Sequence, residues 1–494
     1  MKTRHLTGLS IFYVLIPFIV FISSWIRVEF AAIALACLLI GLWKAYKTSN
    51  WEHETYFPPK VLLVLLLVSL GLTTLSGAGE LLTQVGDWRK HNLILNDLIR
   101  KPWPVVYTDS HYFCYYLAYY LVPALAGKLM GVSGALLTCF LWTCLGLWLA
   151  CLWVYDLGGK TLWVIIGFLF SGNLLWLVNV PVGIFRLIHG EKLIHAWSNN
   201  GVFLTYKAHA ILIPLLYDSV LPSILYIPQH VLGTWIVIGM AYKAIQKQLS
   251  FSWVIMAIIP LPLWASVAAL GILPWAFYAW LRNGNLRNDL IQICAFLPGL
   301  LLMAFYLTGH TDLEMSGWYL PNVGKMVVFF FLNWGVYLLA AYYVNKQTSF
   351  FTIVKQPVFW LAALVISAGS FIYVGPVNDF GNRFALASFW MLWVGISANT
   401  VYYLKNNKLN ARILMLLGVC LFAAQYAIKV MLLVPIGKYQ SASHINKSTL
   451  GEINQNGNTL EEYGLTVRQY EGKPESVFSK YLMKPNKNTE VFGE

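Results

Sequence analysis

Apolar stretches long enough to cross a lipid bilayer recur along this chain of 494 residues. A spanning helix rises about 1.5 Å per residue, so about 20 mainly apolar residues cross the hydrocarbon core. Such stretches lie near 9–26, 30–43, 61–77, 113–130, 133–154, 161–187, 223–244, 252–267, 268–281, 291–308, 325–345, 356–375, 384–404 and 411–432. The pattern predicts an all-α polytopic membrane protein with about 13–15 transmembrane helices.

The composition agrees with a protein whose surface mostly meets lipid. Hydrophobic residues make up 58% of the chain and charged residues only 11%, whereas a soluble domain carries roughly a quarter charged residues. The net charge of +13 is explained by the Lys and Arg that gather in cytoplasmic loops of membrane proteins. No arginine-rich soluble segment is present, so we expect no nucleic-acid partner.

The basic residues predict the orientation of the helices. A cytoplasmic N-terminus places these residues in short inside loops: Lys44, Lys47, Lys128, Lys243, Lys247, Arg282, Arg287, Lys346, Lys355, Lys405, Lys408 and Arg412. This orientation requires the stretch 161–187 to cross twice, with a break at 171–173. It also predicts a multi-pass protein of the cytoplasmic membrane, or of the endoplasmic reticulum, with an extracytoplasmic C-terminus.

Three sizeable segments fall on the outer side under this topology. They are the first outer loop at 78–112, the second at 188–222 and the polar tail. We therefore expect a transmembrane domain over 1–432, followed by a small extracytoplasmic C-terminal domain or tail over 433–494.

The first outer loop carries the strongest functional pattern. Glu80 and Asp87 precede an amphipathic stretch, 88–101, which contains Trp88 and several basic residues and ends before Pro102. A short helix with an indole and basic residues is expected to lie in the membrane interface. Its polar residues, Asn92, Asn96 and Asp97 among them, are expected away from the apolar side.

An acid surrounded by cations at this depth suits transfer of a sugar from a lipid phosphate. Inverting transfer needs a carboxylate that takes the acceptor's proton, and cations that offset the departing phosphate. Asp87 or Glu80 is the candidate base. The candidate phosphate-binding residues in this loop are Arg89, Lys90, His91, Arg100 and Lys101. The alternative is that this charged cluster is merely solvated.

The order of features over 87–131 resembles the GT-C superfamily of polyprenyl-phosphate-dependent glycosyltransferases. It looks most like the lipid A aminoarabinose transferase and protein mannosyltransferase branches. In those families an acid in the first outer loop is followed by an interfacial helix, a tryptophan-proline turn, an aromatic segment and a glycine corner. These features match Asp87, 88–101, Trp103-Pro104, 112–116 and Lys128-Leu129-Met130-Gly131.

The resemblance implies a GT-C-like fold and a glycosyltransferase, expected to be inverting. It implies transfer from a polyprenyl-phosphate sugar donor to a lipid-linked glycan, cell-surface polymer or protein on the non-cytoplasmic face. Asp87 would be the general base, with Glu80 as its backup or as a metal ligand. Arg383 and the cations of the first loop would hold phosphate.

Three further clusters are secondary candidates. His189 and His195, with Glu80, are weak ligands for a divalent cation (Mg²⁺ or Mn²⁺), against the reading that 188–222 is an ordinary polar loop. Gln229 and His230 open an apolar stretch and either line the active groove or make interfacial hydrogen bonds. Asp379 and Arg383 either contact a lipid phosphate or form a structural ion pair.

Two other functions compete with glycosyl transfer. A polysaccharide polymerase or ligase would use a diphosphate-linked glycan and would rely on arginines in a large late loop, but the late loops here are short. A lipid or glycan transporter would need charged residues near mid-bilayer, and few ionisable residues lie deep within the apolar stretches.

Overall fold

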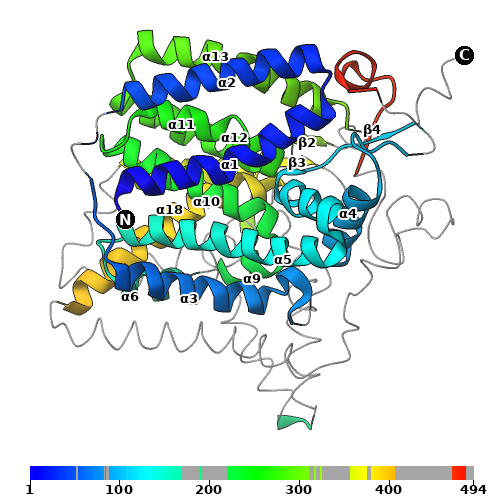
Figure 1. The fold of residues 1–494 in the computed structure, drawn as a ribbon. Coiled ribbons are helices and arrows are strands. Elements are labelled where there is room, and N and C mark those ends of the chain that lie inside the picture. The colour runs from blue at the N-terminus through cyan, green and yellow to red at the C-terminus, as the bar shows by residue number, and fades with distance from the viewer. Residues whose placement is uncertain are drawn as a thin grey trace, which may run out of the picture. The chain divides into compact units, whose positions relative to one another are not determined.

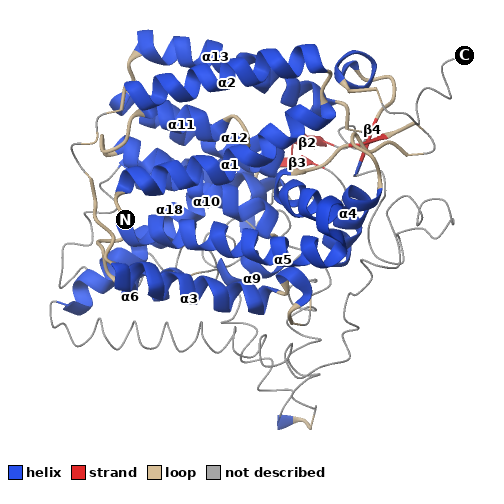
Figure 2. Ribbon diagram, in the orientation of Figure 1, coloured by secondary structure: helices blue, strands red, loops and turns tan. Residues whose placement is uncertain are grey.

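The computed structural model describes residues 1–49, 51, 54–82, 84, 88–107, 110–169, 171, 188–190, 220–310, 316–318, 323–324, 327, 357–374, 380–405 and 470–485. Helices make up most of this part of the chain, with a few short strands (Figure 2). The chain forms two compact units. The first contains 1–153, 226–315 and 439–494, and the second contains 154–225 and 316–438.

Six of the described helices are long and apolar enough to cross a membrane. They are α1 (Thr3–Trp25), α2 (Val28–Lys47), α3 (Pro59–Ser76), α5 (Ala118–Leu157), α12 (Leu261–Asn283) and α13 (Leu286–Thr308), seen in Figure 1. A shorter apolar helix is α17 (Pro357–Gly369). These helices support the predicted all-α polytopic membrane protein. The predicted spans 325–345 and 411–432 lie almost wholly outside the described residues.

The first unit also contains shorter elements. These are η1 (Ala78–Glu80), α4 (Trp88–Arg100), β1 (Tyr112–Phe113), α10 (Pro228–Ile245), α11 (Phe251–Ile258), β4 (Glu471–Gly472) and η7 (Phe478–Leu482). The second unit contains α6 (Leu162–Leu169), β2 (Ser316–Trp318), β3 (Ile372–Val374) and α18 (Phe380–Lys405), and α9 (Val220–Tyr226) leads from it into the first unit. In the second unit α18 packs against α6 and α17, and β2 pairs antiparallel with β3.

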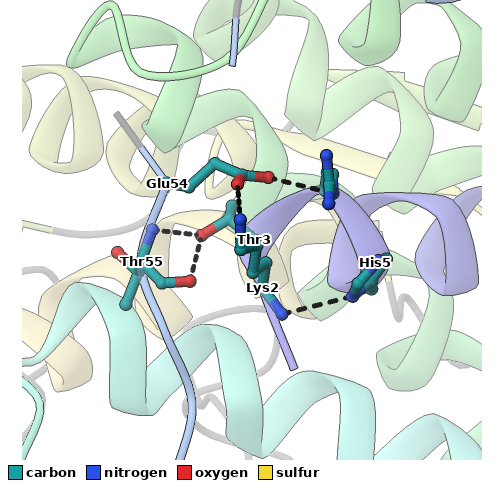
Figure 3. A network of polar contacts seen from close by, with 6 residues as sticks. Lys2, Thr3, His5, Glu54 and Thr55 are labelled. Carbon is teal, nitrogen blue, oxygen red and sulfur yellow. Dashed lines mark hydrogen bonds and ion pairs between the residues drawn. The ribbon is translucent and has the colours of Figure 1, made fainter. Parts of the chain in front are cut away.

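The starts of α1 and α3 meet at one end of the first unit, which we call the N-terminal end. Glu54 forms ion pairs with Lys2 at 3.2 Å and with Arg4 at 3.4 Å (Figure 3). The backbone and hydroxyl of Thr3 exchange hydrogen bonds with Thr55. The segment before α3 is therefore fastened to the first turn of α1.

The opposite end, which we call the loop end, gathers segments from the whole length of the first unit. It contains the α1–α2 turn, η1, α4, β1, the end of α13 and residues 470–485. Arg27 donates from Nε to the Met483 carbonyl at 3.2 Å, and β4 pairs antiparallel with β1. The backbone N–H of Lys473 donates to the Gly309 carbonyl at 2.8 Å. Residues 470–485 of the C-terminal tail thus pack against the predicted first outer loop and the segments beside it.

Helix α5 consists of two limbs that meet at Gly131. This residue has φ +75° and ψ −174°, a conformation that glycine adopts much more readily than other residues. The Tyr119 hydroxyl lies 2.6 Å from Thr143 Oγ1, although 24 residues would separate them by about 36 Å in a straight helix. The limb 118–130 therefore folds back on the limb 132–157. The predicted glycine corner is confirmed.

The predicted span 113–130 is wrong. Residues 118–130 extend only about 20 Å, less than the hydrocarbon thickness. The longer limb starts at the loop end, where Leu136 and Phe140 lie against Gly79, and it runs beside α3 toward the N-terminal end. Both ends of the short limb therefore lie at the loop end. Near the far end of α3, Trp148 donates from Nε1 to the Leu62 carbonyl at 3.1 Å.

This correction changes the predicted topology. Lys128 lies at the loop end, whereas Lys44 and Lys47, in the last turn of α2, lie at the N-terminal end. The predicted orientation also no longer requires a double crossing of 161–187. Without a span at 113–130, a single crossing there keeps the later basic loops on the predicted inner side. The total number of spans and the side that faces the cytoplasm stay predictions.

Helices α11 and α12 form a second folded pair. The Asn283 side-chain amide donates to the Leu249 carbonyl at 2.7 Å, so the chain returns to the N-terminal end from which it left. The helical geometry breaks at Ala265, with φ −165° and ψ 96°, close to the predicted boundary between 252–267 and 268–281. Among the described helices, Leu261–Asn283 is the candidate span in this region, so the division into the two predicted spans 252–267 and 268–281 stays a prediction.

Lys128 caps the C-terminal end of α4. Its Nζ donates to the carbonyls of Ile99 at 3.2 Å and Lys101 at 2.6 Å. These carbonyls have no partner within the helix, and a cation is favourable there. We expect Lys128→Met to destabilise the last turn of α4 by about 1 kcal/mol, measured as faster hydrogen exchange of its amides. Lys60→Met, an exposed change at the start of α3, should leave that exchange unaltered; equal effects would contradict the cap.

Candidate functional site

The first outer loop begins with a tight turn that places Glu80 over α5. Gly77, Gly79 and Glu80 have φ of +82°, +76° and +59°. A Cβ at position 79 would lie 2.8 Å from both the Leu136 carbonyl oxygen and Phe140 Cβ, so only glycine fits. Glu80 is a non-glycine residue in the left-handed region, a conformation that costs energy and clusters at functional sites.

The Glu80 carboxylate is tied to α4 through an amide. Asn92 donates from Nδ2 to Glu80 Oε1 at 3.2 Å and to Gln84 Oε1 at 2.7 Å. Gln84 in turn donates from Nε2 to the Gly77 carbonyl at 2.9 Å. Burial raises the pKa of Glu80 above its ordinary value. This carboxyl group is half-buried and held in one direction, which suits a group that binds or exchanges a proton.

Helix α4 forms where the amphipathic stretch 88–101 predicted it, but it is buried on its polar side too. Asn92, Asn96 and Asp97 are at most 2% exposed. Tyr107 donates its hydroxyl to Asp97 Oδ2 at 3.1 Å, and burial followed by the nearby Asp97 charge raises the pKa of Tyr107 well above its usual range. These polar residues of α4 are therefore covered by other protein segments and are not exposed to solvent.

His91 joins α4 to two other segments. Its Nδ1 lies 2.5 Å from the Tyr120 hydroxyl, and its Nε2 lies 3.1 Å from the Tyr226 carbonyl oxygen. A carbonyl only accepts, so Nε2 carries a hydrogen and donates it to the Tyr226 carbonyl. His91 thereby fixes the position of α4, and both ring nitrogens are engaged in this arrangement.

His230 lies next to the aromatic segment 112–116. The Tyr116 ring packs edge-on against the His230 ring, with ring centroids 4.9 Å apart. The Tyr115 ring packs against the rings of both Tyr116 and Tyr470, with centroids 4.7 Å apart in each pair. Gln229 is 1% exposed, and no described residue donates to its Oε1. His91 and His230, which the sequence selected for separate reasons, thus each contact a tyrosine of the stretch 116–120, and their roles stay predictions.

The predicted phosphate-binding cations are placed differently from one another. Lys101 Nζ lies 3.8 Å from Asp97 Oδ1 and 4.4 Å from the centre of the Tyr107 ring, so it is engaged within the loop. Lys90 is half-buried and Arg100 is exposed. The structure describes the backbone of Arg89 but not its side chain. The phosphate roles of all four residues stay predictions.

Other predicted site residues belong to the second unit or lie outside the described residues. Arg383, on α18, and His189 belong to the second unit. Asp87, His195 and Asp379 lie outside the described residues. Within the described part of the chain, no three His, Cys, Asp or Glu residues are grouped closely enough to hold a metal ion.

Sequence reasoning did not select Gln84, Asn92, Tyr107 or Tyr120 as site residues. Asn92 was only placed away from the apolar side of the helix, and a neutral amide beside charges carries no signal of its own. The pairing of Tyr115 with Tyr470 joins residues more than 350 positions apart in the chain. Only the folded arrangement brings such residues together.

Comparisons with family models, with curated proteins and with solved structures find no match for this chain.

Proposed function

We propose that this protein is a membrane glycosyltransferase of the GT-C type. It transfers a sugar from a polyprenyl-phosphate donor to a lipid-linked glycan, cell-surface polymer or protein. Residues at the loop end carry out the reaction on the non-cytoplasmic side. Asp87, which directly precedes α4 in the sequence, is the general base, and Glu80 is the second acid.

The observation that carries the proposal is the layer formed by residues 77–120. This layer contains Glu80 held against α4, His91 of α4 bound to Tyr120, and the aromatic segment, whose Tyr116 packs against His230. It stands at one end of helices whose outer faces are apolar, since Leu63, Leu67 and Leu137 are all more than half exposed. An isoprenoid chain among such helices would present its phosphate and its sugar's anomeric carbon at this layer.

The chemistry expected there is general base catalysis with charge stabilisation. A carboxylate takes the proton from the acceptor hydroxyl while that oxygen attacks the anomeric carbon, and the bond to the donor phosphate breaks. Cations of the first loop offset the charge on the departing polyprenyl phosphate.

The test is a transfer assay with purified protein in liposomes. A panel of polyprenyl-phosphate sugars with labelled sugars is supplied together with a lipid and glycan extract as acceptor. Mass spectrometry should detect free polyprenyl phosphate and the labelled acceptor. Consumption of a diphosphate-linked glycan instead would indicate a polymerase or ligase, and movement of intact donor across the bilayer would indicate a transporter.

A further inference from the structure

The turn that carries Glu80 does not orient the carboxylate by itself. The turn sets the backbone at φ +59°, but the side chain of a glutamate has three further rotatable bonds. Among the described residues, the hydrogen-bond donor to the Glu80 carboxylate is Asn92 Nδ2, at 3.2 Å from Oε1. The direction of the carboxylate therefore depends on the side chain of Asn92.

The hydrogen-bond directions around Asn92 follow from one backbone carbonyl. The Gly77 carbonyl can only accept, so Gln84 must turn its NH₂ group toward it and its Oε1 toward Asn92. Asn92 must then present its own NH₂ group, with one hydrogen to Gln84 Oε1 and the other to Glu80 Oε1. This series of hydrogen bonds fixes the orientation of the Asn92 amide and uses both hydrogens of its Nδ2 atom.

Asn92 is 2% exposed and Gln84 is 4% exposed, so water does not replace these bonds easily. A hydrogen bond donated to a carboxylate favours its ionised form, whereas burial favours the protonated form. From these contacts we infer that Asn92 is a positioning residue for Glu80, which it holds oriented and ionised for the transfer reaction. The consequence for the reaction rests on the proposed function; the consequence for the ionisation of Glu80 does not.

The other groups that face Glu80 from the described elements do not supply this effect. From α5 the facing titratable group is the Cys139 thiol, which lies within electrostatic reach of Glu80. The last two turns of α3 carry no ionisable side chain. On α4, the neighbouring His91 has both ring nitrogens directed at Tyr120 and Tyr226.

The experiment compares Asn92→Ala with Asn96→Ala. Asn96 is fully buried one turn further along α4 and is not a partner of Glu80, so its loss controls for general damage to the helix. Asn92→Asp keeps the side-chain volume and serves where the alanine variant fails to fold. The carboxylic-acid band of Glu80, assigned by its disappearance in Glu80→Gln, is titrated by infrared spectroscopy in each purified variant.

Loss of the Asn92 donor should move the titration of Glu80 to higher pH, because the ionised form loses a hydrogen bond. The acidic limb of the pH–rate profile for transfer should move in the same direction, and the rate at neutral pH should fall about ten- to hundredfold. Asn96→Ala should leave both the titration and the limb unmoved.

An unchanged Glu80 titration in both Asn92 variants would overturn the inference, and so would an equal shift in Asn96→Ala. A shifted titration in a protein that transfers no sugar from any donor would refute the proposed function and leave the control of Glu80 by Asn92 supported. The two failures are therefore separable.

Discussion

Asp87→Asn is expected to lower the rate of sugar transfer by about 10²- to 10⁴-fold, the usual contribution of a general base. Asparagine keeps the shape of aspartate but cannot accept the acceptor's proton at neutral pH. The donor should still bind, so the loss should fall on kcat with little change in KM. Initial rates of polyprenyl-phosphate release in liposomes, over a range of donor concentrations, measure both quantities.

Glu29→Gln is the matched control for this variant. Glu29 is an exposed acid in the first turn of α2, at the loop end, and it has no role in the proposed chemistry. It removes one negative charge from the same end of the unit without touching the layer of residues 77–120. If Asp87→Asn retained wild-type turnover while remaining folded, the base assignment would pass to Glu80.

Tyr306→Phe is expected to destabilise the first unit by about 2–4 kcal/mol, the largest stability effect that we predict. The fully buried Tyr306 hydroxyl accepts the Tyr115 backbone N–H at 3.0 Å. It donates its one hydrogen between the carbonyls of Phe113 at 3.1 Å and Tyr115 at 3.2 Å. Phenylalanine fills the same space but leaves these backbone groups without their side-chain partner in a buried site.

The measurement is the shift in the unfolding midpoint of the purified protein in one detergent, compared with Tyr481→Phe. Tyr481 is 62% exposed, so the loss of its hydroxyl should change stability little. Because Tyr306 supports the segment next to Tyr116 and His230, the Phe variant should also weaken transfer. Equal midpoints for the two variants would show that α13 does not support the aromatic segment in this way.

Local features of the candidate site followed well from sequence. The stretch 88–101 became α4 (Trp88–Arg100), and the predicted glycine corner formed at Gly131. The helix depends on signals that act within a few residues, namely amphipathic periodicity and flanking prolines, whereas the corner was implied by the family resemblance.

Local sequence signals could not predict the end of the first unit at which Lys128 lies. An apolar run near the length of a span looks the same whether it crosses the bilayer or folds back on its neighbour. Tyr119 pairs with Thr143, and Lys128 reaches the end of α4, so residues 118–130 fold back. The positive-inside rule treated Lys128 as a cytoplasmic charge because it counts basic residues without knowledge of their partners.

By itself, the sequence determined that this chain is a helical membrane protein, where most of its described helices lie, and which loop concentrates acids, cations and aromatic residues. Apolar length and local periodicity decide those properties, and both are properties of contiguous residues. The tertiary structure alone decided that Asn92 orients Glu80, that Tyr120 and Tyr226 engage His91, and that Tyr470 from the tail packs on Tyr115. Those contacts join residues distant along the chain, and only packing of the folded helices selects one set of partners among the many that hydrogen bonding would allow.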